Sequence, residues 1–101
     1  MEKIIQITSG RGPAECTWVV AQVLKKVLKE AEAFDLKATV LQHLAGQENG
    51  TVATATILLE GKNASEFSNA WIGTIQWIGT SSFRKFHKRK NWFIEIGRAH
   101  V

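Results

Sequence analysis

The sequence predicts an α+β fold: a split β-α-β (ferredoxin-like) sandwich with two helices on one face of a mostly antiparallel sheet. Three observations lead to this class. Segments with strand and helix character follow one another as strand, helix, strand, strand, helix, strand, and a last strand is added. A stripe of apolar residues at helical spacing marks one long helix. The length of 101 residues suits one domain, so we expect residues 1–101 to form a single domain.

The first half of the chain supplies a strand, the long helix and a hairpin. Residues 3–8 are rich in isoleucine and predict the first strand, which residues 9–13 interrupt. Residues 37–44 and 51–60 predict the next two strands, and Asn49-Gly50 between them is typical of a hairpin turn. The long helix is expected over residues 13–34, because apolar side chains recur there at i, i+3, i+4 and i+7, namely Cys16, Val19, Val20, Val23, Leu24, Val27, Leu28 and Ala31.

The second half is expected to add a short helix and two strands. Asn63 followed by Glu66 resembles a capping box, which predicts a helix from there to about Ala70. Residues 71–78 predict the fourth strand and residues 91–96 the fifth, with a basic segment between them as a C-terminal hairpin. We expect Trp71 and Trp77 to share a face with Ile75. Both faces of this strand are partly apolar, so the pattern leaves open which one is buried.

Composition indicates the cellular compartment in which the protein is expected. The single cysteine, Cys16, excludes an internal disulfide. No stretch approaches the roughly 20 apolar residues of a membrane-spanning helix, and residues 1–10 lack the pattern of a secretory signal. We therefore expect a cytoplasmic protein without a membrane partner.

The positive charge of the chain is concentrated in one segment. There are 13 Lys and Arg residues against 9 Asp and Glu, and five of the 13 cations fall within residues 84–90, where there is no acid. Outside that segment 8 cations face 9 acids, which leaves a net charge of −1. A local basic cluster indicates a polyanionic partner.

For the other candidate sites, the sequence favours a structural role over a binding or catalytic role. Residues 10–13 join a strand to a helix but lack the Gly-Lys-Ser/Thr of a phosphate-binding loop, so a tight turn is favoured, with Glu15 near the positive helix end. Cys16 lies in the apolar stripe and is expected to be a small buried hydrophobe. His43, His87 and His100 share no metal-ligand spacing, and no catalytic motif is present. We predict no metal, no cofactor and no enzymatic activity.

The segment before the last strand carries the functional hypothesis. It interleaves five cations with aromatic residues; cations neutralise phosphates and aromatic rings stack on unpaired bases. The alternative is a solvated turn flanked by core aromatics. The predicted RNA-binding residues are Ser81, Ser82, Phe83, Arg84, Lys85, Phe86, His87, Lys88, Arg89, Lys90 and Trp92.

Three stretches resemble the bacterial peptide chain release factor H family, a short branch of the class-I release factors: residues 5–16, 73–78 and 87–93. The resemblance covers residues 3–96 and implies a codon-recognition-type domain. Ser81-Ser82-Phe83 is similar to the family's Ser-Pro-Phe tripeptide, with Ser82 in the proline position, and His87 stands for its downstream His. The loop here is shorter and more basic. The family is associated with rescue of ribosomes that have damaged decoding-centre RNA, so stop codon and damaged ribosomal RNA remain alternative targets.

The resemblance stops before the catalytic part of the family. Class-I factors continue into a domain with a Gly-Gly-Gln motif, which promotes hydrolysis of peptidyl-tRNA; this chain has none, and residues 97–101 form a tail unlike the family's continuation. The sequence therefore predicts a noncatalytic module, truncated or separately encoded, that binds the ribosome, its RNA or messenger RNA in the decoding centre. The missing domain would be encoded downstream. The alternatives are a small ligand-binding or dimerising interaction domain and a folded remnant without function; the oligomeric state is left open.

Overall fold

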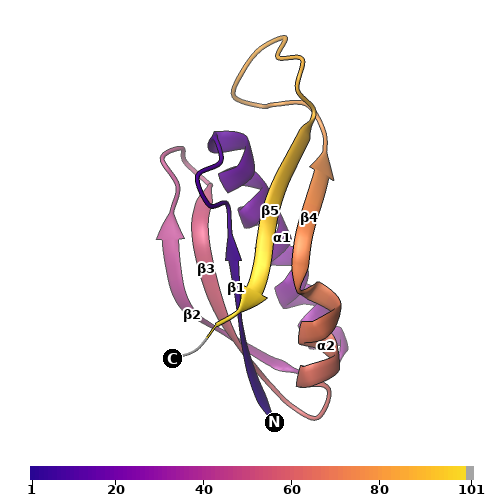
Figure 1. Ribbon diagram of the computed structural model, residues 1–101. Helices are drawn as coiled ribbons and strands as arrows, with labels where there is room; N and C mark the ends of the chain where they lie inside the picture. The colour runs from indigo at the N-terminus through magenta and orange to yellow at the C-terminus, as the bar shows by residue number, and fades with distance from the viewer. Residues whose placement is uncertain (100–101) are drawn as a thin grey trace.

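The computed structural model describes residues 1–99 and contains five strands and two helices in that range (Figure 1). The N-terminal part of the chain forms β1 (Glu2–Thr8), α1 (Ala14–Ala33), β2 (Lys37–Ala45) and β3 (Val52–Glu60). The remainder forms α2 (Ala64–Trp71), β4 (Gly73–Ile78) and β5 (Asn91–Arg98). The α+β class and the two helices on one sheet agree with the prediction.

The five strands form one sheet in the order β2-β3-β1-β5-β4, and every neighbouring pair is antiparallel. The strand added to the ferredoxin-like order is therefore β4, which lies at the edge, while β5 takes the place beside β1. The pairing explains this arrangement, since β4 and β5 are matched residue for residue from Gly73↔Ile96 to Ile78↔Asn91. The hairpin joins the sheet through its second strand.

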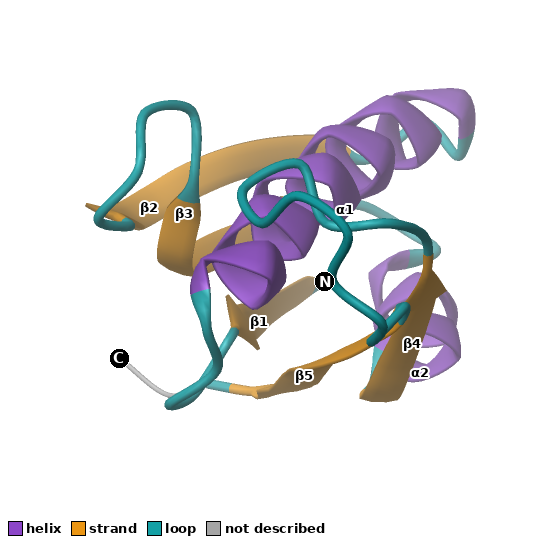
Figure 2. Ribbon diagram, turned by 90° about the horizontal axis from the view of Figure 1, so that it is seen from above, coloured by secondary structure: helices purple, strands orange, loops and turns teal. Residues whose placement is uncertain are grey.

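The core lies between the helices and one face of the sheet (Figure 2). Along β5 alternate residues are buried, and the same alternation occurs in β1, whereas in β3 the consecutive residues 55–57 are all buried. The stripe predicted for α1 covers them, so the long helix is confirmed in place and extent. The fully or nearly fully buried members include Ile5, Ile7, Val19, Val20, Val23, Val27, Ala31, Ile57, Leu59, Trp92, Ile94 and Ile96.

The opposite face of the sheet carries polar side chains together with the exposed apolar residues Ile78 and Phe93. Gln6 donates a hydrogen bond to Thr56, and the Thr8 and Thr54 hydroxyls lie 3.3 Å apart across the β1–β3 pair. In β4, Ile75 and Trp77 pack against the core while Thr74, Gln76 and Ile78 are exposed. The question that the sequence left open is thus answered, and the face with Ile75 and Trp77 is the buried one.

Three local predictions were wrong. Trp71 ends α2 and does not begin β4, because Gly73 adopts a backbone φ of +136° that favours glycine and turns the chain between the two elements. Trp71 still packs on the same core as Ile75 and Trp77. The Asn63 side chain makes no capping hydrogen bond, so the capping box is absent. β5 extends to Arg98 and pairs with β1, so residues 97 and 98 belong to the sheet; residues 100–101 of the expected tail, with His100, lie outside the described residues.

Membrane insertion through a helix finds no support in residues 1–99, where neither α1 nor α2 combines the length and the apolar character that a bilayer requires.

Candidate nucleic-acid interface

Residues 79–90 form a loop that rises beyond the ends of β4 and β5 (Figure 1). The start of α1 lies at the same end of the molecule. At the base of the loop the Gly79 N–H donates a hydrogen bond to the Lys90 carbonyl at 2.8 Å. The Trp92 indole N–H donates to the Gly79 carbonyl at 2.9 Å. The hairpin ladder thus continues one step into the loop.

Glu15 of α1 ties the loop to the body of the protein. Its carboxylate accepts hydrogen bonds from Arg84 Nε at 2.6 Å, Arg84 Nη2 at 3.0 Å and the Ser81 hydroxyl at 2.6 Å. The two guanidinium bonds reach different oxygens, which is the strong bidentate form of this ion pair. The Glu15 side chain is 4% exposed and the Arg84 side chain 46% exposed, so the ion pair joins a buried carboxylate to a guanidinium group that faces solvent.

The ionisation of Glu15 follows from these contacts. Burial is the largest influence and acts to raise the pKa of the carboxyl group. The hydrogen bonds from Arg84 and Ser81, and one from its own backbone, outweigh it and lower the pKa from 4.5 to about 2. The same hydrogen bonding raises the pKa of Arg84. Both groups are therefore charged at neutral pH.

Ser81 organises the first part of the loop. Its hydroxyl oxygen accepts hydrogen bonds from the backbone N–H of Phe83 at 3.1 Å and of Arg84 at 2.9 Å, while its proton is donated to Glu15. A serine that bonds backbone groups two and three residues ahead closes a compact turn. Ser82 lies exposed within that turn.

Trp92 lies beneath the loop and not on its surface. It is 2% exposed, and the His87 ring stacks on it with centroids 5.9 Å apart and planes inclined by 28°. The guanidinium carbon of Arg89 lies 4.7 Å from the Trp92 ring centroid and that of Arg84 lies 5.7 Å away. Trp92 therefore supports the loop, and its ring faces are not open to a nucleotide base.

The outer surface of the loop presents three lysines and a phenylalanine. Lys85, Lys88 and Lys90 are exposed. Phe86 is 92% exposed and has a positive backbone φ of 60°, which is uncommon for a bulky residue. The Lys85 ammonium group lies 5.4 Å from the Phe86 ring centroid. Cation and exposed ring thus occupy adjacent positions at the outside of the loop.

The structure divides the predicted residues into two groups. Those that build the loop are Ser81, Arg84, His87, Arg89 and Trp92. Those left on the surface are Ser82, Phe83, Lys85, Phe86, Lys88 and Lys90. Two contributing residues were not indicated by any sequence pattern. Glu15 is a partner of the loop, and Trp18 of α1 packs edge-on against Trp77 with ring centroids 5.3 Å apart. Both lie near the beginning of α1, far from the loop in sequence, and no local pattern connects them.

The other candidate sites, the turn at residues 10–13 and Cys16, have contacts that indicate structural roles. Gly10 has a φ of +58°, and the Gly12 N–H donates to the Ser9 carbonyl, which makes the expected tight turn. Cys16 is buried as predicted, and burial raises the pKa of its thiol. Within residues 1–99 no three His, Cys, Asp or Glu side chains gather as a metal ion would require.

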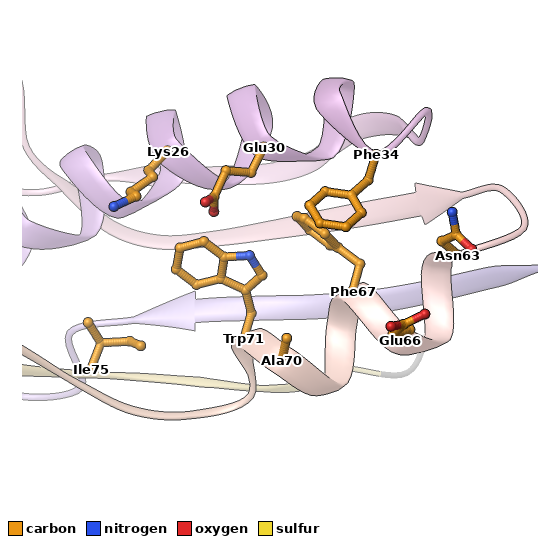
Figure 3. Close-up of a pocket in the computed structure, with 9 residues that line it drawn as sticks. All are labelled: Lys26, Glu30, Phe34, Asn63, Glu66, Phe67, Ala70, Trp71 and Ile75. Carbon is orange, nitrogen blue, oxygen red and sulfur yellow. The ribbon is translucent and has the colours of Figure 1, made fainter.

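A separate cavity of about 440 Å³ lies between α1 and α2 (Figure 3). Trp71 and Phe67 point from α2 toward Phe34 at the end of α1, and the Phe34 and Phe67 ring centroids are 5.5 Å apart. Lys26 and Glu30 stand on the α1 side. This apolar cavity is the feature of the structure on which a ligand-binding role would rest.

Comparison with known proteins supports the fold. No protein-family model matches the chain. A curated protein from Escherichia coli, a peptide chain release factor homolog, is 44% identical over 95 residues, which cover 94% of this chain and 47% of the relative. Over almost its whole length the chain is similar to part of a peptide chain release factor homolog. It spans about half the length of the relative that it matches.

A solved structure places this release-factor-like chain among known folds. RF2 of Thermus thermophilus superposes with a TM-score of 0.83 over 96% of the chain and 27% of RF2, at 23% sequence identity. The match shows that the two helices and the five-stranded antiparallel sheet are a fold found within a release factor.

Proposed function

We propose that the release-factor-like chain is a noncatalytic recognition module that binds structured ribosomal RNA through residues 79–90. The observation that carries this proposal is the ordered loop itself, which holds Lys85, Lys88 and Lys90 in solvent beside the exposed ring of Phe86. Three cations suit three phosphates, and an exposed ring suits an unpaired base. The similarity to a peptide chain release factor homolog supports the ribosome as the partner.

The loop geometry favours Phe86 over His87 as the stacking residue. His87 already stacks on Trp92. Phe86, in contrast, stacks on no other aromatic ring of residues 1–99 and is almost fully exposed. The positive φ of Phe86 is a strained conformation for a bulky residue, and strain of this kind is found at functional sites. The decoding-centre RNA, which has unpaired bases near phosphates, is the target we favour, and messenger RNA in that centre is the alternative.

Peptide release and localisation follow from the same proposal. The chain has no Gly-Gly-Gln motif, so hydrolysis of peptidyl-tRNA would be carried by a different polypeptide segment, encoded downstream. A ribosomal partner places the protein in the cytoplasm. The proposal treats the chain as a single recognition domain.

The test is titration of a decoding-centre RNA hairpin with the protein at several salt concentrations. We expect three or four phosphate contacts, from Lys85, Lys88, Lys90 and, in part, Arg89, whose guanidinium group already lies over Trp92. The slope of log K against log salt should therefore be about −2 to −4. Changing Lys85, Lys88 and Lys90 to Ala should weaken binding and bring the slope toward zero. The matched control replaces Lys25, Lys26 and Lys29 of α1, which removes the same charge away from the loop and should leave the slope nearly unchanged.

Phe86→Ala tests the stacking contact. Stacking releases no counterions, so we expect affinity for the hairpin to fall roughly 5- to 100-fold with an unchanged slope, and affinity for a fully paired duplex to stay the same. Phe93→Ala, which removes an exposed ring from the sheet, is the control. Equal, salt-insensitive binding by the wild type and the triple lysine variant would contradict the RNA proposal and favour the ligand-binding alternative at the α1–α2 cavity.

A further inference from the structure

We propose that Glu15 is the positioning residue that holds the basic loop in its RNA-binding conformation. This inference rests on the proposed function and adds a residue outside the loop to it. Glu15 is the one charged residue that is buried in the described part of the chain. Its side-chain partners are Ser81 and Arg84, both in the loop.

A carboxylate removed from water needs compensating donors. Here the donors are the Ser81 hydroxyl and two N–H groups of the Arg84 guanidinium, 66 and 69 residues further along the chain. These side-chain donors reach the buried carboxylate only when residues 81–84 are folded against α1. Burial of Glu15 and order in the loop depend on each other.

The contact sets the direction of the residues that follow. Ser81, fixed by Glu15, accepts the N–H groups of Phe83 and Arg84, which closes the turn immediately before Lys85 and Phe86. Arg84 is fixed at its side chain by the same carboxylate. The two residues with the exposed cation and the exposed ring thus leave the turn in a defined direction.

For a Glu15→Gln variant, a role of Glu15 through charge alone and a role in positioning the loop predict opposite changes in RNA affinity. Glu15 neutralises Arg84, so replacing Glu15 by Gln adds one positive charge to the loop. If the loop acted only through its charge, Glu15→Gln would bind RNA more tightly and with a steeper salt slope. If Glu15 positions the loop, the variant binds more weakly although its charge is more favourable. The sign of the change therefore separates the two roles.

The experiment compares wild type, Glu15→Gln and Glu32→Gln on the decoding-centre hairpin. Glu32 is an exposed acid on the same helix, so its variant matches the charge change. We expect affinity to fall about tenfold in Glu15→Gln, which is the cost of ordering one or two side chains on binding, and to be unchanged or slightly higher in Glu32→Gln. We also expect Phe86→Ala to have little further effect when Glu15 is replaced.

A second readout needs no RNA. Hydrogen exchange at the Phe83 and Arg84 amides, and trypsin cleavage after Lys85 and Lys88, should accelerate at least tenfold in Glu15→Gln relative to Glu32→Gln, with unchanged protection in β1 and β3. If wild type fails to bind RNA, the proposed function fails while this readout still tests the contact. If wild type binds and Glu15→Gln binds equally or more tightly, the positioning role is overturned.

Ser81→Ala keeps the inference testable if Glu15→Gln does not fold. This change removes the hydroxyl between Glu15 and the turn and leaves the Arg84 ion pair in place. We expect a smaller loss of affinity in the same direction, with faster exchange at Phe83. Affinity and exchange both equal to wild type would overturn the inference.

Discussion

Glu15 and Trp92 acquire their roles from contacts that a local sequence pattern does not contain. The sequence placed Glu15 near the positive end of a helix, and the structure adds Arg84 and Ser81 as its partners. Trp92 was expected at the RNA surface, yet it lies beneath the loop. One signal was available, because Trp92, Ile94 and Ile96 alternate along a strand and alternation places them on one face. For Glu15 there was none, since its partners are tens of residues away.

The ion pair of Glu15 predicts a pH-dependent contribution to stability. The pKa of Glu15 is lowered to about 2 in the folded protein from an ordinary value of 4.5. Its contribution is therefore fully present above pH 4.5 and is lost as the pH falls toward 2. We expect wild type to exceed Glu15→Gln in free energy of unfolding at pH 7, and the difference to shrink to near zero at pH 2. Urea unfolding of both proteins at several pH values measures this, and a difference that does not vary with pH would refute it.

At the scale of elements, the strongly periodic segments were predicted well and the junctions were not. The prediction for α1 was within one residue at each end, because its apolar stripe is long and the sheet buries all of it except Leu28, which is partly buried. The boundary between α2 and β4 was misplaced because Trp71 suits either element, and the decision is made by the positive φ of Gly73. The order of β4 and β5 in the sheet depends on which hairpin strand buries more apolar surface, which the sequence leaves unspecified.

The packing of α1 on the sheet can be tested at one position. Val23 is buried in the core cluster, so Val23→Asp places an unpaired charge there and should lower the free energy of unfolding by about 3–5 kcal/mol. Lys25→Asp puts the same residue on the exposed side of the helix and should cost about 1 kcal/mol or less, mainly through helix propensity. Chemical denaturation followed by circular dichroism gives both values. Similar costs at the two positions would be inconsistent with the observed core.

At the scale of the whole molecule, one end of the sheet carries the features on which the proposed function rests. The loop and the start of α1 meet there (Figure 1), and Trp92 lies beneath the loop. The cavity between α1 and α2 is lined by other residues (Figure 3). The basic segment, its cations and its place between two strands could be predicted from the sequence. Which of these residues are free to bind could not, because that depends on the tertiary contacts of Arg84, His87 and Arg89.

The lack of a Gly-Gly-Gln motif predicts the behaviour of the chain on ribosomes. Purified protein added to ribosomes carrying labelled peptidyl-tRNA should release no more peptide than buffer does, because binding alone supplies no group to position the attacking water. The assay should include a complete release factor as a positive control. Release above the buffer level by this chain would show that the prediction is wrong.

The position of β1 in the middle of the sheet has a consequence for the order of folding during synthesis. β1 and α1 are synthesised before the elements that they contact. β1 can pair fully only after β3 and β5 have been made, and the Glu15 carboxylate can form its ion pair only after Ser81 and Arg84 have been made. Until β5 has joined β1, the cations of residues 84–90 sit on an unanchored chain. The contact between Glu15 and Arg84 is therefore a marker of complete folding, and a nascent or partly unfolded molecule carries the charge of the loop without its shape.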